Sequence, residues 1–183
     1  MIEGERVQLR RMGPQDAADV VRLRSDPDVQ AQLFSERPPT VAEHLRWLAD
    51  VDARGDRHEF MIVERTSGRS VGTIGLSRID PTLRRAEYGV LIGESDARGK
   101  GLASEASRLL LGYAFGTLRL HRVYLHVFVH NAPALRLYRR VGFEPEGVLR
   151  QHVWKGDEFH DVVVMAVLAG ERSTTSEGPK PKG

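Results

Sequence analysis

The stretch Arg98-Gly99-Lys100-Gly101-Leu102-Ala103-Ser104-Glu105 lies between a predicted strand that ends near Ile92 and a strongly helical segment. Its two glycines let the backbone turn sharply and approach a ligand closely. The helix that follows begins with free N–H groups and the positive end of its dipole, a combination that binds phosphate, and Arg98 and Lys100 add positive charge. The spacing matches neither GxxxxGK[ST] nor GxGxxG. The stretch predicts a phosphate cradle (residues 98–105), and the alternative is a strand-to-helix turn that needs only small residues.

A second stretch, Asn131-Ala132-Pro133-Ala134-Leu135-Arg136-Leu137-Tyr138-Arg139-Arg140-Val141-Gly142-Phe143, follows the next predicted strand. Asn131 can cap this helix and still offer its amide to a ligand. Tyr138 lies two turns further along. Two helices that rise from adjacent strand ends would hold phosphates on one side and offer an amide and a phenol on the other. Such a pair suits a long ligand with a pyrophosphate, an amide arm and a reactive end.

Composition limits the remaining classes of protein. The chain has 183 residues, 40% hydrophobic and 28% charged, which is ordinary for one globular domain. It has no cysteine, which excludes disulfides, thiolate metal sites and a cysteine nucleophile. The net charge is +2 and no long run of like charge occurs, so we expect no nucleic-acid partner. No apolar run is long enough to cross a bilayer or to act as a secretion signal, so we expect no membrane partner and a cytoplasmic location.

Residues 1–170 contain no internal repeat and no linker, which predicts one domain, and the polar composition of residues 171–183 predicts a disordered tail. Thr40 and Glu43 form a capping box that opens one of the helices. The predicted elements are a strand at 7–10, helices at 14–24, 29–34 and from 41 onward, strands at 60–64, 70–76 and 86–92, a helix at 102–115, a strand at 123–129, a helix at 132–141, and a closing hairpin of 148–154 and 161–168. This order predicts a mixed α/β domain around one central sheet.

The two stretches resemble a known family. Arg98-x-x-Gly101-x-Ala103 is similar to the [QR]xxGx[GA] signature of the GNAT-superfamily acetyl-CoA-dependent N-acetyltransferases, and residues 131–143 resemble that superfamily's second acyl-CoA motif. The opening of the chain, including Leu9-Arg10 and residues 26–29, resembles the RimJ/RimL-like branch. The resemblance covers about residues 5–168. It implies a mixed, mostly antiparallel sheet in which two parallel strands, 86–92 and 123–129, splay apart around acetyl-CoA.

The resemblance also implies a set of cofactor-binding positions. Backbone N–H groups around residues 98–103 would hold the pyrophosphate, and a backbone N–H in the preceding strand would stabilise the oxyanion. The positions expected to bind acetyl-CoA are Val90, Leu91, Ile92, Arg98, Gly99, Lys100, Gly101, Leu102, Ala103, Ser104, Asn131, Ala134 and Tyr138. No metal is expected, because no HExxH pattern or other paired histidine ligands occur.

Two side chains are expected to carry the chemistry, in which an amine attacks the thioester directly. Tyr138 matches the family tyrosine that donates to the CoA sulfur, and its alternative role is to fill the core. Glu87 occupies a strand position where related enzymes often carry a proton-accepting glutamate, directly or through water. Its alternative roles are an exposed strand carboxylate or a residue that orients the acceptor.

Other residues give weaker signals. We expect most of the seven histidines to be solvated or structural, although His126 and His130 could face the acceptor pocket. His152 and His160 on the closing hairpin are weak candidates for the same pocket. We expect Trp47 to pack its helix onto the sheet, with a pocket wall as the alternative. The resemblance places residues 25–41 on the acceptor side, so residues 34–39 could set specificity or form a plain connector.

The sequence leaves the acceptor open. The leading hypothesis is acetyl transfer to a primary amine, either a protein N-terminus as in ribosomal-protein acetylation or a small molecule. Polyamines, cationic antibiotics and nucleotide-linked amino sugars are the alternatives, and a non-catalytic acyl-CoA sensor is a contrasting one. A polyamine site should be rich in acidic residues, but the N-terminal region carries as many arginines as acids. Family resemblance alone suggests a homodimer.

Overall fold

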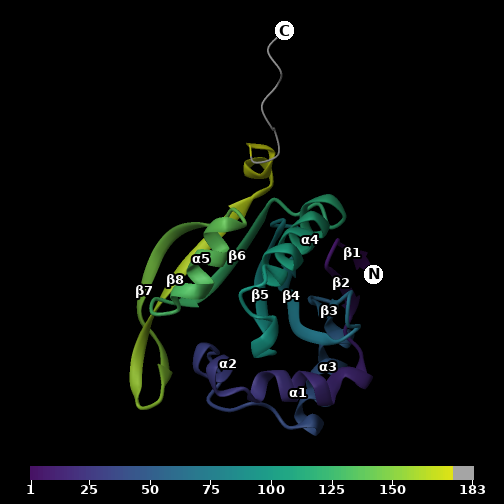
Figure 1. Ribbon diagram of the computed structural model, residues 1–183. Coiled ribbons are helices and arrows are strands. Elements are labelled where there is room, and N and C mark those ends of the chain that lie inside the picture. Colours follow the sequence, from purple (N-terminus) through teal and green to yellow (C-terminus); the bar gives the residue numbers. More distant parts are fainter. Residues whose placement is uncertain (175–183) are drawn as a thin grey trace.

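In the computed structural model, which describes residues 1–174, the chain forms one eight-stranded sheet flanked by helices (Figure 1). Its strands lie in the order β1-β2-β3-β4-β5-β6-β8-β7. Neighbouring strands run antiparallel, except that β5 and β6 are parallel. The strands are β1 (Ile2–Glu3), β2 (Val7–Arg11), β3 (His58–Glu64), β4 (Ser70–Asp80), β5 (Arg85–Ile92), β6 (Arg122–Phe128), β7 (Glu144–Lys155) and β8 (Glu158–Leu168). The prediction of a mixed, mostly antiparallel sheet is confirmed.

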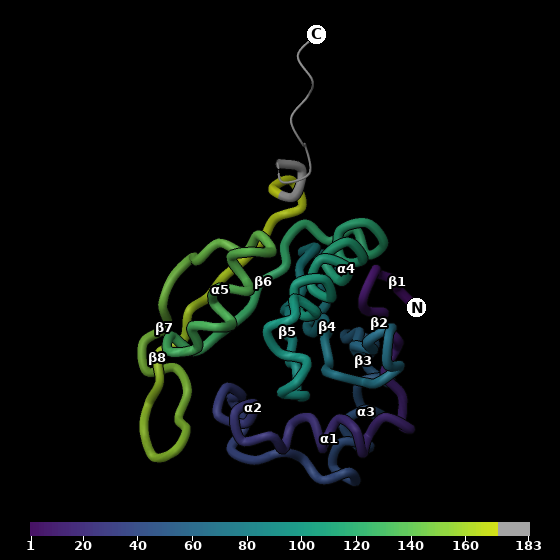
Figure 2. The backbone as a smooth tube through the Cα atoms, viewed as in Figure 1, coloured from purple at the N-terminus to yellow at the C-terminus, as the bar shows by residue number. Residues whose placement is uncertain are grey.

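Five α-helices lie in the described part of the chain. They are α1 (Ala17–Ser25), α2 (Pro27–Gln32), α3 (Val41–Arg54), α4 (Leu102–Gly116) and α5 (Ala132–Arg140), and short 3-10 helices span Pro14–Asp16, Ser95–Ala97 and Ala169–Thr174. The backbone trace shows α4 and α5 beside the central strands and α1 to α3 gathered at another side of the molecule (Figure 2). None of the helices in residues 1–174 is both long and apolar enough to span a bilayer.

One hydrophobic cluster lies on each face of the sheet. Successive residues of a strand point to opposite faces, and β5 shows this clearly. Tyr88 belongs to the cluster that includes Leu110 and Val141, whereas Leu91 belongs to the cluster that includes Leu23 and Val29. Tyr88 therefore faces α4 and α5, and Leu91 faces α1 and α2. By the same alternation Glu87 shares the α1–α2 face with Leu91.

The parallel strands β5 and β6 pair over only three residues each. Residues 85–87 pair with 122–124, and neither strand has a partner in the other beyond that point. The predicted splay is therefore confirmed, and it begins at Glu87 and Tyr124. From Tyr88 onward, the edge of β5 that faces β6 has no paired strand.

Several predicted boundaries are wrong, and the errors lie in polar sequence. Strand β7 begins at Glu144 rather than 148, because Glu-Pro-Glu-Gly at its start lacks alternation yet still pairs with β8. Strand β4 continues to Asp80 rather than 76, and β8 begins at Glu158 rather than 161. The two-residue strand β1 was not predicted at all.

The predicted ends of helices agree better with the structure where a capping residue marks them. The Thr40 hydroxyl accepts a hydrogen bond from the Glu43 N–H at 3.2 Å, and the Glu43 carboxylate accepts one from the Thr40 N–H at 2.8 Å. This capping box begins α3 as predicted.

The expected polar tail starts inside the 3-10 helix Ala169–Thr174, and its remainder, residues 175–183, lies outside the described residues.

Candidate active site

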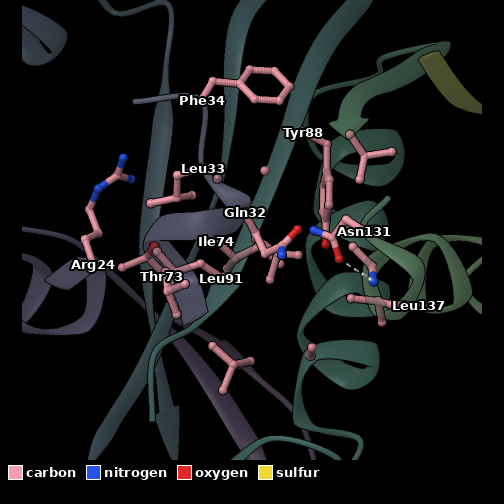
Figure 3. Close-up of a pocket in the computed structure, with 18 of the residues that line it drawn as sticks. Arg24, Gln32, Leu33, Phe34, Thr73, Ile74, Tyr88, Leu91, Asn131 and Leu137 are labelled. Atoms are coloured by element: carbon pink, nitrogen blue, oxygen red, sulfur yellow. Dashed lines mark hydrogen bonds between the residues drawn. The ribbon is translucent and has the colours of Figure 1, made fainter. Parts of the chain in front are cut away.

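A cleft of about 1420 Å³ opens where β5 and β6 diverge (Figure 3). Its walls come from both faces of the sheet, so that Tyr88 and Asn131 lie on one side of it and Arg24 on the other. The volume exceeds the 300–1,000 Å³ of ordinary ligand pockets. A ligand that extends from one face of the sheet toward the other fits this shape.

The phosphate cradle has the geometry that the sequence predicts. Gly99 and Gly101 adopt φ of +76° and +80°, the left-handed region that favours glycine. The Glu105 N–H donates to the Gly101 carbonyl at 3.1 Å, as the first hydrogen bond of α4. The preceding amides at the start of the helix have no intrahelical acceptor and are available to an anion. The residues present therefore fit a pyrophosphate.

A contact that the sequence did not predict anchors the cradle. The Glu105 carboxylate accepts hydrogen bonds from the Arg6 backbone N–H at 2.8 Å and from Arg6 Nε at 2.9 Å. Arg6 Nη1 in turn donates to the Lys100 carbonyl at 2.9 Å. The segment before β2 is thus bound to both the loop and the first turn of α4. The partners are 99 positions apart in the sequence, which explains why no local pattern could reveal this contact.

The two cationic side chains of the cradle, Arg98 and Lys100, take different positions relative to the cleft. Arg98 forms ion pairs with Asp26 at 2.8 Å and Asp28 at 3.2 Å, and it also donates to the Ile92 and Gly93 carbonyls. Its charge therefore holds the loop against α2. Lys100 does not line the cleft. The expectation that both side chains add positive charge to the phosphate site stays a prediction, in which the ion-paired Arg98 borders the cleft and the backbone of the cradle supplies further donors.

The other predicted cofactor positions line the cleft but come from two faces. Val90 and Ile92 pack with the α4 cluster, whereas Leu91 packs with α1 and α2. Asn131 caps α5, because its side-chain oxygen accepts a hydrogen bond from the Ala134 N–H at 3.2 Å (Figure 3). The predicted cap is confirmed, and the amide still borders the cleft.

Tyr138 lies at the inner part of the cleft, on the face covered by α4 and α5. Its ring is 7% exposed and packs edge-on against Tyr88 and Phe143, with ring centroids 6.0 Å and 5.9 Å apart. Burial raises the pKa of Tyr138 to about 12. The phenol therefore keeps its proton at physiological pH and can donate it, and its ring also fills the core, as its alternative role required.

Glu87 lies at the point where β5 and β6 separate, and it is not alone there. His126 Nδ1 lies 2.8 Å from one Glu87 oxygen, and Arg78 Nη1 lies 3.1 Å from the other. The His126 ring also stacks on His152, with centroids 6.0 Å apart. His126 lines the cleft, as one of the two histidines expected to face a pocket, but its partner Glu87 was not predicted because it is on another strand. The parallel register pairs Glu87 with Tyr124, which is two positions before His126 on β6. This register was the signal that could have placed Glu87 and His126 together.

The remaining candidates divide between the cleft and the closing hairpin. His130 stacks on Phe128, His160 contacts Phe128 edge-on, and neither histidine lines the cleft. Trp47 packs against the α1–α2 cluster as predicted and also borders the cleft. Most of residues 34–39 line the cleft. Among the described residues, no three His, Asp or Glu side chains gather as a metal site would require.

The parallel strands β5 and β6 splay apart beside a glycine cradle that begins a helix. With the capping amide and the buried phenol nearby, this arrangement is typical of an acyl-CoA-binding acyltransferase. Residues 6–144 match the acetyltransferase (GNAT) domain, and the chain belongs to the GNAT family of acetyl-CoA-dependent N-acetyltransferases. Acetyl-CoA is its co-substrate.

The relatives agree with this assignment. The uncharacterized N-acetyltransferase p20 of Bacillus licheniformis is 31% identical over 171 residues, which cover 91% of this chain and 95% of that protein. Spermidine N(1)-acetyltransferase of Escherichia coli K12 is 30% identical, covering 88% and 86%. The crystal structure of spermidine N-acetyltransferase from Vibrio cholerae with CoA and spermine is similar, with a TM-score of 0.86 at 25% identity, covering 93% and 100%.

Proposed function

We propose that this enzyme acetylates a primary amine by direct attack, with the Glu87–His126 pair accepting the amine proton and Tyr138 donating to the departing sulfur. The observation that carries the proposal is the position of the two groups. Glu87 and Tyr138 line one cleft from opposite faces of the sheet, beside the point where β5 and β6 separate. A thioester in the gap would have the acceptor on one side and the acid on the other.

The reaction exchanges one bond for another at the thioester carbon. The amine nitrogen forms a bond to this carbon, and the C–S bond breaks. The amine proton passes to Glu87, directly or through water, and the thiolate takes the Tyr138 proton. Solvent then restores both groups. The unpaired edge of β5 supplies the backbone N–H groups suited to the negative charge that develops on the carbonyl oxygen.

The acceptor class follows from the charges around the cleft. Five carboxylates and seven arginines line it, and four of these carboxylates are already paired with arginine. These pairs are Asp28–Arg98, Glu43–Arg37, Glu59–Arg57 and Glu87–Arg78. A polyamine would have to displace arginines to reach them. The α-amine of a protein N-terminus, with a pKa near ~8, needs less help from a base and fewer carboxylates.

Relatives support both acceptor classes. The spermidine N-acetyltransferases favour a polyamine. The putative ribosomal N-acetyltransferase YdaF of Bacillus subtilis, 29% identical, favours the RimJ/RimL-like branch and an N-terminal amine. Calorimetry with acetyl-CoA, followed by a thiol-release screen across peptides, amino acids, polyamines, aminoglycosides and amino sugars, decides between them. Binding without turnover of any class would contradict the proposed chemistry and favour an acyl-CoA sensor.

Glu87→Gln should lower the acetylation rate most at low pH. Without the base, the enzyme depends on amine that is already neutral in solution, and that fraction falls as pH decreases below the amine pKa. We expect the deficit in kcat/KM to be on the order of 10²-fold near pH 7 and to shrink as pH rises. Rate profiles from pH 6 to 10 measure it. Glu64→Gln, at the end of β3 and outside the cleft, is the matched control, and a deficit that does not depend on pH would assign Glu87 a positioning role.

We also propose that the chain assembles with copies of itself. Strand β7 is the last strand of the sheet, and Val148, Trp154 and Phe159 on the β7–β8 hairpin are each more than half exposed. Unpaired strand edges and exposed aromatics are common at subunit interfaces. Spermidine N-acetyltransferase from Vibrio cholerae has a dodecameric structure. Sedimentation equilibrium should give a mass that is a multiple of 20.5 kDa, and a monomer at micromolar concentration would contradict the proposal.

A further inference from the structure

Two polar side chains on the acceptor side of the cleft have nitrogen atoms without a partner in residues 1–174. His44 on α3 is 5% exposed, and its Nε2 has no hydrogen-bond partner. The Nε of Arg24 on α1 is likewise buried and without a hydrogen-bond partner. Both residues line the cleft. A buried donor without a partner is costly, so such atoms call for an explanation.

The two groups lie close enough to influence each other. Burial lowers the pKa of His44, and the Arg24 charge lowers it further, so His44 is neutral. In the tautomer with hydrogen on Nε2, His44 donates a hydrogen bond, as Arg24 does. The His44 ring stacks on Trp47, with centroids 5.1 Å apart. Arg24, His44 and the aromatic ring of Trp47 thus border the same cleft, and Figure 3 shows Arg24 across it from Tyr88 and Asn131.

The surroundings leave an excess of positive charge. Glu59 is the acid whose charge acts on Arg24, but Arg57 already pairs with Glu59 at 3.2 Å. Burial raises the pKa of Glu59 to about 7, although Arg57 opposes this, so part of its negative charge is missing near neutral pH. Met12 and Val20 add apolar walls. An oxyanion would supply both the acceptor atoms and the charge that this place lacks.

We propose that Arg24 and His44 form a subsite for an oxyanion of the acceptor, a carboxylate or a phosphate, so that the substrate is an amine that also carries an acidic group. This inference rests on the proposed function, and it deepens that function by naming the second group of the acceptor. Polyamines have no such group. The subsite lies on the face that Glu87 shares, so the acidic group would lie beyond the attacking nitrogen.

Matched acceptor pairs test the subsite directly. L-ornithine is compared with putrescine, which lacks its carboxylate, and glucosamine 6-phosphate with glucosamine, which lacks its phosphate. We expect at least tenfold higher kcat/KM for one acidic member over its partner, and the pair that shows the preference tells carboxylate from phosphate. Thermal shifts with CoA-saturated enzyme should show the same preference. A binding preference without turnover would support the subsite and overturn the proposed function. Equal response within both pairs, or spermidine as the best acceptor, would overturn the subsite.

Arg24→Met separates a ligand-binding role from a structural one. The variant should lose the preference for the acidic member, yet its ligand-free Tm should rise by roughly 2–4 °C, because a buried charge without adequate partners is removed. Arg22→Met is the matched control on the same helix, since Arg22 pairs with Glu94 and does not line the cleft. If Arg24→Met fails to fold, His44→Asn should weaken the preference instead. An unchanged preference in a folded variant would overturn the proposal.

Discussion

Gly101→Asp is expected to abolish acetyl-CoA binding, with a rise in Kd of at least 100-fold by calorimetry. Gly101 has φ of +80°, where a residue with a Cβ is strained by about 1–2 kcal/mol. A Cβ at this position would lie 3.3 Å from the Arg6 guanidinium, which is tied to Glu105 and the Lys100 carbonyl. An aspartate there also places negative charge where the pyrophosphate would lie. A 100-fold loss corresponds to about 2.7 kcal/mol, which repulsion between the aspartate and the phosphates, together with displacement of the loop from its binding conformation, can supply.

Gly55→Asp is the control that isolates the phosphate effect. Gly55 ends α3 with φ of +68°, a Cβ added there would meet nothing within 4 Å, and the residue does not line the cleft. This variant carries the same backbone strain and the same charge without a nearby ligand. It should lose stability but keep its affinity for acetyl-CoA. Normal affinity in folded Gly101→Asp would mean that the phosphates bind elsewhere.

Tyr138→Phe is expected to lower kcat by on the order of 10²-fold, while the Kd for acetyl-CoA stays within about twofold. The substitution removes only the hydroxyl, so the ring keeps its edge-on contacts with Tyr88 and Phe143. The pKa near 12 means that the phenol is protonated throughout the working range. A donor that holds its proton is suited to a thiolate, which becomes a strong acceptor only as the C–S bond breaks. Stopped-time thiol release and calorimetry give the two quantities.

Tyr113→Phe provides the comparison for this loss. The Tyr113 hydroxyl bonds to His58 Nδ1 at 2.9 Å and does not line the cleft. Its loss should change stability slightly and kcat not at all. Equal turnover in Tyr138→Phe and the wild type would remove Tyr138 from the chemistry and leave its ring as core packing.

Local signals in the sequence predict much of this molecule. The cradle glycines, the Asn131 cap and the Thr40 capping box each depend on residues within a few positions, and the structure has all three. Short runs of apolar and branched residues, and the turn between residues 64 and 70, predicted the central strands for the same reason. Residues 144–147 were not predicted as part of a strand, because an edge strand can be polar on both faces and still pair on one side.

Contacts between distant segments account for most of what sequence reasoning missed. Glu105 meets Arg6, and Glu87 meets His126, only after the sheet has formed. The direction of the Arg98 side chain also depends on its ion pairs with Asp26 and Asp28 at the start of α2, a helix far away in the sequence. Motif spacing shows that a residue is near a site, but its hydrogen-bond partners come from the packing of other elements. For Arg98, those partners are Asp26 and Asp28, which its motif position did not reveal.

The gap between β5 and β6 has a consequence for the order of events in turnover. The cradle and Tyr138 lie with α4 and α5, whereas Glu87 lies on the face of α1 and α2, so under the proposed function the two substrates would approach the reaction centre by separate routes. A ternary complex would then form whichever substrate arrives first, and we expect product CoA to compete with acetyl-CoA alone. High concentrations of the amine should therefore not relieve inhibition by CoA.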